Sequence, residues 1–242
     1  MEQFLANRKA IVTGGTKGIG LDVARALLSA GASVVICGRN RQRIDPALSE
    51  LETSAPGRKV AACVADVSDS GAVRELFSFA DHELGGLDIL VNNAGSAVFR
   101  PAAELSIEEW NQTIGTNLSG AFYCSREALS RFRSGTGGWI VNISSLAGKN
   151  PFAGGAAYNA SKFGLNGMTE ALMLDHRHDD VKVSYIMPGS VDTKFGGHSG
   201  QEKSEWKIAP EDIAEIVLDI LRKPGRTLVS RVEVRPTKPP RK

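Results

Sequence analysis

Tyr158, Lys162 and Ser145 are the residues whose types and spacing most directly suggest chemistry. Tyr158 and Lys162 are four residues apart, so on a helix their side chains leave the same face. A free tyrosine has a pKa of about 10, and a neighbouring ammonium group favours the phenolate, so the pair would serve as a general acid and base. Tyr-x-x-x-Lys also occurs by chance on solvated helices. Ser145 strengthens the pattern, because its hydroxyl could hold a carbonyl oxygen beside the tyrosine.

A glycine-rich segment follows the first apolar run and precedes a helical stretch that continues to Ala30. Glycines let the backbone turn tightly and approach a pyrophosphate, which the N–H groups at the start of the next helix stabilise. An ordinary turn between a strand and a helix is the alternative, but the position after the first strand favours a cofactor site. The residues expected to contact the cofactor are Gly14, Thr16, Lys17, Gly18, Ile19 and Gly20.

The residues after the second apolar run indicate which cofactor is preferred. An acidic side chain there would bind the ribose hydroxyls of NAD and repel a 2′-phosphate. This chain has Cys37-Gly38-Arg39 instead, and the planar guanidinium of Arg39 matches phosphate geometry. Lys17 could add a second positive charge. Unless both are simply solvated surface cations, the sequence predicts NADP(H).

Another polar segment, Asn92-Asn93-Ala94-Gly95, closes the fourth apolar run. Open α/β sheets bind ligands at the carboxyl ends of their strands, so Asn93, Ala94 and Gly95 are expected to contact the cofactor. Asn and Gly also favour turns, which is the structural alternative.

The elements that position these residues alternate along the chain. Short apolar runs predict strands, and the segments between them, including one from Ile107 to Phe132 that begins with a Ser106/Glu109 capping box, have a helical period. Strand and helix in alternation predict an α/β fold with a doubly wound, Rossmann-like parallel sheet. The expected strands are Lys9–Thr13, Ser33–Cys37, Lys59–Val64, Asp88–Val91, Trp139–Ile143, Lys182–Met187 and Arg231–Val234.

Length and composition fit one domain. The 242 residues contain 42% hydrophobic and 23% charged residues, which is ordinary for a globular protein. No linker divides the chain, so we expect one dinucleotide-binding domain over residues 1–235. Residues 236–242 hold three prolines and three basic residues and are expected to form a flexible tail. Ser190–Ala209 lacks a clear period and is typical of a long binding loop.

Several classes of partner are excluded at this level. The net charge of +2 comes from scattered Lys and Arg, so no nucleic acid is expected. Three widely spaced cysteines suggest neither disulfides nor a metal site, and His176 and His178 lack a third ligand. Neither a secretory signal nor an apolar run of about 20 residues is found. We expect a cytoplasmic protein without metal or membrane contact.

Together these motifs resemble the short-chain dehydrogenase/reductase family, in its compact single-domain branch, from about Arg8 to Val234. Three residues separate Gly14 from Gly18, as in that branch, whereas the extended branch has a shorter spacing. The other matching features are Asn92-Asn93-Ala94-Gly95, Asn117, Ser145, Tyr158-x-x-x-Lys162 and Pro188-Gly189.

The resemblance implies a role for each matching residue. Tyr158 would be the acid/base, Ser145 would orient the carbonyl, and Lys162 would tune the tyrosine and bind the nicotinamide ribose. Asn117 resembles the asparagine that keeps a water in the proton relay, unless it is a polar residue on a solvated helix. Ser144 is a rival to Ser145, but thirteen residues before the tyrosine is the family's usual spacing. The remaining expected cofactor contacts are Asp66, Val67, Pro188, Gly189, Val191 and Thr193; Asp66 could instead cap the next helix.

The resemblance also implies hydride transfer between nicotinamide and a carbonyl or alcohol carbon. A non-catalytic NADP(H)-binding regulatory protein is the alternative, marked by loss of a catalytic residue, and enoyl reductases have a longer Tyr-to-Lys spacing. We expect an apolar pocket, which favours a small-molecule carbonyl or alcohol substrate with some hydrophobic bulk. Its candidate residues are Val98, Phe99, Leu146, Phe152, Phe195 and Trp206. In the family, helices of one subunit pack against those of another, so the resemblance implies a homo-oligomer. Because the C-terminal segment of this chain departs from the family's usual one, we expect either a dimer or a tetramer.

Overall fold

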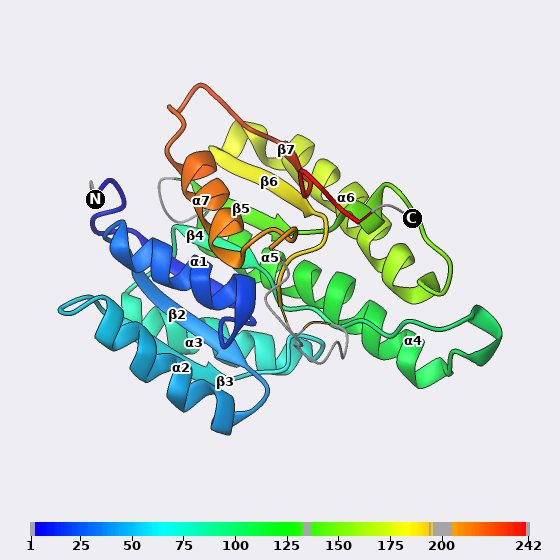
Figure 1. Ribbon diagram of the computed structural model, residues 1–242. Coiled ribbons are helices and arrows are strands. Elements are labelled where there is room, and N and C mark those ends of the chain that lie inside the picture. Colours follow the sequence, from blue (N-terminus) through cyan, green and yellow to red (C-terminus); the bar gives the residue numbers. More distant parts are fainter. Residues whose placement is uncertain (1–2, 133–136, 194, 196–204, 241–242) are drawn as a thin grey trace.

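A computed structural model describes residues 3–132, 137–193, 195 and 205–240. Their strands form one seven-stranded parallel sheet in the order β3-β2-β1-β4-β5-β6-β7 (Figure 1). This confirms the predicted doubly wound, Rossmann-like α/β fold. The strands are β1 Lys9–Thr13, β2 Ser33–Gly38, β3 Val60–Val64, β4 Ile89–Asn92, β5 Gly138–Ile143, β6 Val181–Pro188 and β7 Arg231–Val234.

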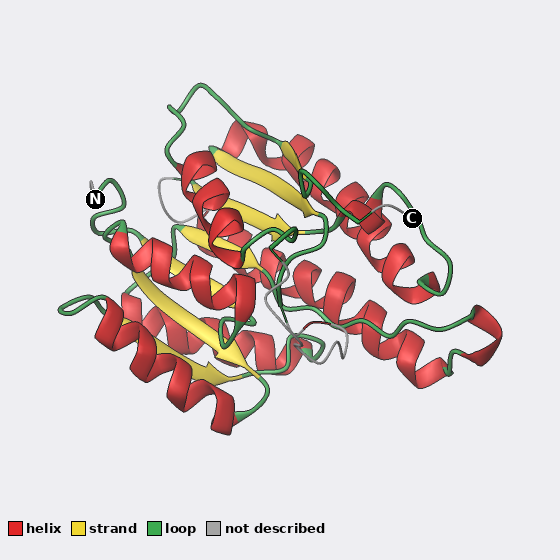
Figure 2. Ribbon diagram, in the orientation of Figure 1, coloured by secondary structure: helices red, strands yellow, loops and turns green. Residues whose placement is uncertain are grey.

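Helices cover both faces of the sheet, as Figure 2 shows. The helices α1, α2 and α7 pack on one face with the cluster around Leu27, Leu51 and Val217, while α3 and α5 pack on the other with Phe77 and Phe132. The α-helices are α1 Gly18–Ser29, α2 Arg41–Ser54, α3 Ser70–Leu84, α4 Ile107–Ile114, α5 Gly120–Phe132, α6 Ala156–His176 and α7 Pro210–Leu221. Short helical turns lie at Ala102–Glu104, Leu146–Gly148 and Arg177–Asp179.

The central strands are continuous apolar runs because both of their faces are covered. In β1, Ala10, Ile11 and Val12 are fully buried, and the same holds for Ile89, Leu90 and Val91 of β4. Alternating residues on one strand therefore enter different clusters: Val12 packs with the α1 side and Ile11 with the α3 side. The absence of a solvent face explains why these strands lack the alternation of half-exposed ones.

The strand order reverses between β1 and β4. From β1 the chain moves outward to β2 and β3, and it then returns to β4 on the other side of β1. The loops that leave β1 and β4 therefore diverge and leave a crevice at the carboxyl edge of the sheet. The glycine-rich segment and Asn92–Gly95 both lie at this edge.

One predicted helix is wrong in its extent. The Ser106/Glu109 capping box is confirmed, but the helix from Ile107 to Phe132 is interrupted by a π-helical turn at Gly115–Ser119, between α4 and α5. The apolar period continues through this turn, so the sequence pattern does not reveal it. Such turns are frequent at functional sites, and this one contains Asn117. The predicted strands are otherwise correct to within about one residue.

Candidate functional site

The glycine-rich loop joins β1 to α1 and is held by a side chain from the neighbouring loop. Gly14 and Gly18 have φ values of 65° and 51°, which favour glycine. The Asn93 amide donates hydrogen bonds to the carbonyl oxygens of Thr13 and Gly14, at 3.0 and 3.1 Å. A Cβ on Gly20 would overlap this amide and the Gly14 carbonyl. Gly20 therefore has to be a glycine for Asn93 to hold the loop in this shape.

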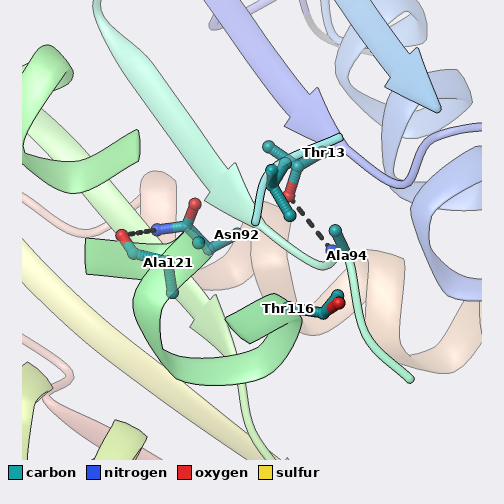
Figure 3. Close-up of a pocket in the computed structure, with 7 residues that line it drawn as sticks. Thr13, Asn92, Ala94, Thr116 and Ala121 are labelled. Carbon is teal, nitrogen blue, oxygen red and sulfur yellow. Dashed lines mark hydrogen bonds between the residues drawn. The ribbon is translucent and has the colours of Figure 1, made fainter. Parts of the chain in front are cut away.

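Thr13 ties the two loops together from inside. Its hydroxyl accepts hydrogen bonds from the backbone N–H groups of Asn93 and Ala94, both at 3.0 Å; Figure 3 shows the second. The amide of Asn92 donates to the carbonyl of Ala121 in α5 at the same cleft. Sequence reasoning missed Thr13 as a site residue. Its signal was only a hydroxyl at the end of an otherwise apolar strand.

Gly38 ends β2 at a point where an acidic side chain would be crowded. A Cβ on Gly38 would lie 2.8 Å from Cγ2 of Thr16, so an aspartate would need Thr16 to move. Arg39 is exposed and, within the described residues, has no recorded ion pair or hydrogen bond. Lys17, also exposed, is the residue before α1. The two predicted cations thus lie on the loops that follow β2 and β1.

Asp66 and Val67 lie just beyond β3. Asp66 Oδ1 accepts hydrogen bonds from the backbone N–H and the hydroxyl of Ser68, at 2.9 and 2.7 Å, while the cap of α3 comes from Asp69. Asp66 therefore shapes a turn, and the alternative of a helix cap is wrong. Val67 is buried on Gly120 of α5, where a Cβ would lie 2.8 Å from its side chain. Their predicted cofactor contact stays a prediction.

The structure brings together the three residues with which the sequence argument began. Tyr158 and Lys162 lie one turn apart on α6 and are both buried. Ser145 precedes the turn after β5, where its hydroxyl accepts a hydrogen bond from the Ala147 backbone N–H at 3.1 Å, and it lies close to the phenol of Tyr158. Lys162 Nζ donates to the carbonyl of Ile143 at 2.9 Å and lies 5.9 Å from the centroid of the tyrosine ring. A phenol, a hydroxyl and an amine thus share one corner of the crevice.

Burial dominates the electrostatics of this corner. It raises the pKa of Tyr158, which the nearby Ser145 hydroxyl partly offsets, and it lowers the pKa of Lys162 to about 8. Lys162 directs its Nζ at the Ile143 carbonyl, and loss of water is the largest influence on the pKa of both groups. The predicted effect of the lysine on the pKa of the tyrosine stays a prediction.

Asn166, one turn beyond Lys162, forms a hydrogen bond with one of the two candidate serines. The Ser144 hydroxyl donates to Asn166 Oδ1, and Asn166 Nδ2 donates to the carbonyl of Gly148 at 3.0 Å. Asn166 thereby holds the chain on both sides of Ser145, and Ser144 is used in that contact. Ser145 lies near Tyr158, and its predicted role in orienting a carbonyl stays a prediction. No local sequence pattern indicates Asn166, because its partners Ser144 and Gly148 are 22 and 18 residues away in the chain.

Asn117 is buried in the π-helical turn, and its side chain is fully engaged by protein groups. Its Oδ1 accepts from the Ser96 backbone N–H at 2.8 Å, and its Nδ2 donates to the Ser96 carbonyl and the Ser161 hydroxyl, at 2.9 and 3.0 Å. The alternative of a solvated helix face is wrong. Asn117 links the β4 loop to α6, and its predicted role in a water relay stays a prediction.

The segment after β6 covers the glycine-rich loop. Pro188 is buried at the end of β6, and Gly189 donates a backbone hydrogen bond to Val234 of β7 at 2.8 Å. Val191 forms a bridge with Ile208. A Cβ on Gly18 would lie 3.1 Å from Cγ2 of Thr193. Thr193 therefore lies beside the loop, and the cofactor contacts of Pro188, Gly189, Val191 and Thr193 stay predictions. Residues 194 and 196–204 of the predicted binding loop fall outside the described part.

Three of the predicted pocket residues gather at Tyr158. The rings of Phe99 and Phe195 lie 5.7 and 5.9 Å from its ring, and Phe152 lies 5.6 Å from Phe99. Leu146 is instead directed at Gly189, where a Cβ would lie 3.2 Å from it. For Val98 and Trp206 the structure gives no contact with the tyrosine.

Histidine and cysteine offer no metal chemistry in the described residues, where no cluster of three His, Cys, Asp or Glu side chains is found. His176 pairs with Asp179 at 2.9 Å, and burial raises the pKa of the Cys37 thiol to about 12. None of the described helices is long and apolar enough to cross a bilayer.

The strand order and the glycine-rich loop at its switch point define the Rossmann-like class. Within this class the chain belongs to the short-chain dehydrogenase family, whose model, described as "short chain dehydrogenase", matches residues 8–204. It is an oxidoreductase of that family. An uncharacterized oxidoreductase of Staphylococcus aureus (strain USA300) is 32% identical over 232 residues, which cover 96% of this chain and 98% of that relative.

Two solved structures are similar over nearly the whole chain. An alcohol dehydrogenase from the archaeon Thermococcus sibiricus, complexed with 5-hydroxy-NADP, has a TM-score of 0.89 at 29% identity and covers 97% of this chain and 99% of its own. A metagenomic short-chain oxidoreductase in complex with NADP has a TM-score of 0.84 at 34% identity, with the same coverage.

Proposed function

We propose that the protein is an NADP(H)-dependent oxidoreductase that interconverts a carbonyl group and an alcohol, with Tyr158 as its acid/base. The observation that carries this proposal is that the Tyr158 phenol, the Ser145 hydroxyl and the buried Lys162 amine lie together at one place. A carbonyl oxygen placed between the two hydroxyl groups would accept a hydrogen bond from each. These donors would stabilise the negative charge that develops on that oxygen.

The cofactor site fits a dinucleotide with a 2′-phosphate. Glycines line the approach to the pyrophosphate, Arg39 is available to a phosphate, and Gly38 provides no carboxylate to repel one. The two NADP-type complexes among the similar structures support this choice. The residues that would hold the cofactor are Gly14, Thr16, Lys17, Gly18, Ile19, Gly20, Arg39, Asp66, Val67, Asn93, Ala94, Gly95, Tyr158, Lys162, Pro188, Gly189, Val191 and Thr193.

Bound NADPH would supply the hydride for reduction, and the chain's own residues would handle the proton. The raised pKa keeps the Tyr158 phenol protonated at neutral pH, so it can donate its proton to the developing alkoxide. Lys162, charged below about pH 8, would stabilise the phenolate that remains. Ser145 orients the carbonyl, and Asn166 and Asn117 position the segments on both sides of the site.

We also propose a homo-oligomer, a dimer or a tetramer. Large apolar side chains are exposed along α4, α5 and α6: Ile107, Trp110, Phe122, Phe163 and Leu174. Single exposed apolar residues are ordinary, but this many on adjoining helices suggest a face that another subunit covers. The same helices pair between subunits in the family that the sequence resembles.

The test is turnover of a panel of ketones, aldehydes and secondary alcohols with NADP(H), in the wild type and in Tyr158→Phe. The variant should lose about 10²- to 10⁴-fold in kcat, because it lacks the proton donor, and should bind NADPH as tightly as the wild type. Full activity in Tyr158→Phe would overturn the mechanism. Tight NADPH binding with no turnover of any panel member would favour the regulatory alternative.

A further inference from the structure

Three phenylalanine rings cluster at Tyr158, two in contact with its ring and one in contact with Phe99, and each comes from a different loop. Phe99 follows β4, Phe152 precedes α6 and Phe195 follows β6. Phe99 meets the tyrosine edge to face, with an interplanar angle of 85° at 5.7 Å, and Phe152 meets Phe99 at 61°. Phe195 is tilted at 54° to the tyrosine. We refer to Phe99, Phe152 and Phe195 as the aromatic triad.

Backbone contacts fix two members of the aromatic triad relative to each other. The Arg100 N–H donates to the carbonyl of Gly154 at 2.8 Å and so ties the loop of Phe99 to the loop of Phe152. Asn159, next to Tyr158, donates from Nδ2 to the carbonyl of Phe152 at 2.9 Å. The Phe152 ring lies over Gly155, where a Cβ would be 2.7 Å from the ring. The two rings are therefore held in place before any ligand arrives.

The rings of Phe99 and Phe152 are nonetheless 40% and 45% exposed. They lie on loops beside Tyr158. The adjoining cation does not make the site attractive to anions, because Arg100 pairs with Glu109 at 3.0 Å. An apolar, aromatic surface beside a catalytic group is the usual sign of a site that binds a ligand of similar character.

We infer that the substrate carries an aromatic ring directly on its carbonyl or carbinol carbon. This rests on the proposed function, in which the substrate oxygen lies at Tyr158 and Ser145. The group attached to the reacting carbon then lies beside the tyrosine ring and in reach of Phe99. An aromatic group there gains edge-to-face contacts in addition to the burial that any apolar group would gain. A neutral aryl ketone or aryl aldehyde is the class that fits.

The test compares two ketones of nearly equal size, acetophenone and cyclohexyl methyl ketone, with NADPH. We expect kcat/KM to be at least about tenfold higher for acetophenone, a difference that corresponds to ~1.4 kcal/mol and to about one good aromatic pair. Phe99→Leu and Phe152→Leu should reduce this preference to within about twofold. Phe79→Leu, the same change on the distant helix α3, should leave it unchanged.

A binding measurement separates this inference from the proposed function. Saturation-transfer NMR of the two ketones with the protein and NADP⁺, which cannot reduce them, should favour acetophenone and lose that preference in Phe99→Leu. If neither ketone is turned over, the proposed function fails while the NMR result still tests the aromatic triad. Equal or greater kcat/KM for the cyclohexyl ketone, or a preference that survives both phenylalanine substitutions, would overturn the inference.

Discussion

Arg39 is the residue on which the proposed cofactor preference depends most directly. Its guanidinium lies on the loop after β2 with no ion pair recorded in the described residues, and Gly38 before it carries no side chain. Replacing Arg39 with alanine should therefore remove a contact that only the 2′-phosphate of NADPH makes. The affinity for NADH, which lacks that phosphate, should change little.

The size of the effect follows from the exposure of this side chain. A hydrogen bond to a charged group contributes about 1.5–3 kcal/mol, and 1.4 kcal/mol corresponds to tenfold. Because Arg39 is exposed and its charge is screened, the low end of that range applies. We expect Arg39→Ala to lower the ratio of kcat/KM for NADPH to that for NADH by about tenfold, mainly through a higher KM for NADPH.

The assay is steady-state turnover of one carbonyl substrate with each cofactor at low ionic strength. Arg58→Ala is a charge-matched control, because Arg58 lies in the turn before β3 at the opposite edge of the sheet. Gly38→Asp should shift the preference in the same direction by repulsion, with some loss of stability from the contact with Thr16. A wild type that uses NADH as well as NADPH, or an unchanged ratio in Arg39→Ala, would refute this reasoning.

Three further predictions follow from other contacts. Burial lowers the pKa of Lys162 to about 8, so kcat/KM for NADPH, which reports the free enzyme, should fall as pH rises through about 8. Lys162→Arg should remove this decline, because arginine stays charged. A wild-type profile that is flat up to pH 10 would contradict the prediction. Asn166→Ala should lower kcat by about tenfold, because the contacts of Asn166 around Ser145 are lost, and should leave KM for NADPH unchanged. An unaltered kcat would show that Ser145 keeps its position without Asn166. Light scattering should give the mass of at least a dimer, and a monomer mass across micromolar concentrations would rule out the proposed interface.

The sequence predicts the sheet well because its central strands are buried on both faces. Continuous apolar runs such as Lys9–Thr13 have no other stable place in an α/β protein, so their limits agree with the observed strand. The π-helical turn at Gly115–Ser119 could not be predicted, since it changes backbone hydrogen bonds without changing the apolar period. Its identification requires the backbone itself.

The candidate site also contains some features that the sequence predicts and others that it does not. Tyr158 and Lys162 could be paired from their spacing, because a helix fixes which residues share a face. The contacts of Asn166 with Ser144 and of Asn93 with Gly14 join segments far apart in the chain, and no local pattern encodes them. The pKa values also depend on tertiary burial. Spacing alone therefore predicts that the lysine acts on the tyrosine, but it does not reveal the loss of water that raises the pKa of the tyrosine and lowers that of the lysine.

The hydrogen bonds of Asn93 have a consequence for protein engineering. Its amide supports Thr13 and Gly14 and occupies the space that a side chain on Gly20 would need, so the glycine-rich loop takes its shape partly from a segment about eighty residues away. A loop transplanted from a relative would adopt the right shape only if Asn93 and the hydroxyl of Thr13 were kept with it. Substitutions at these positions should therefore not be additive, and libraries that vary the loop alone would sample few functional variants.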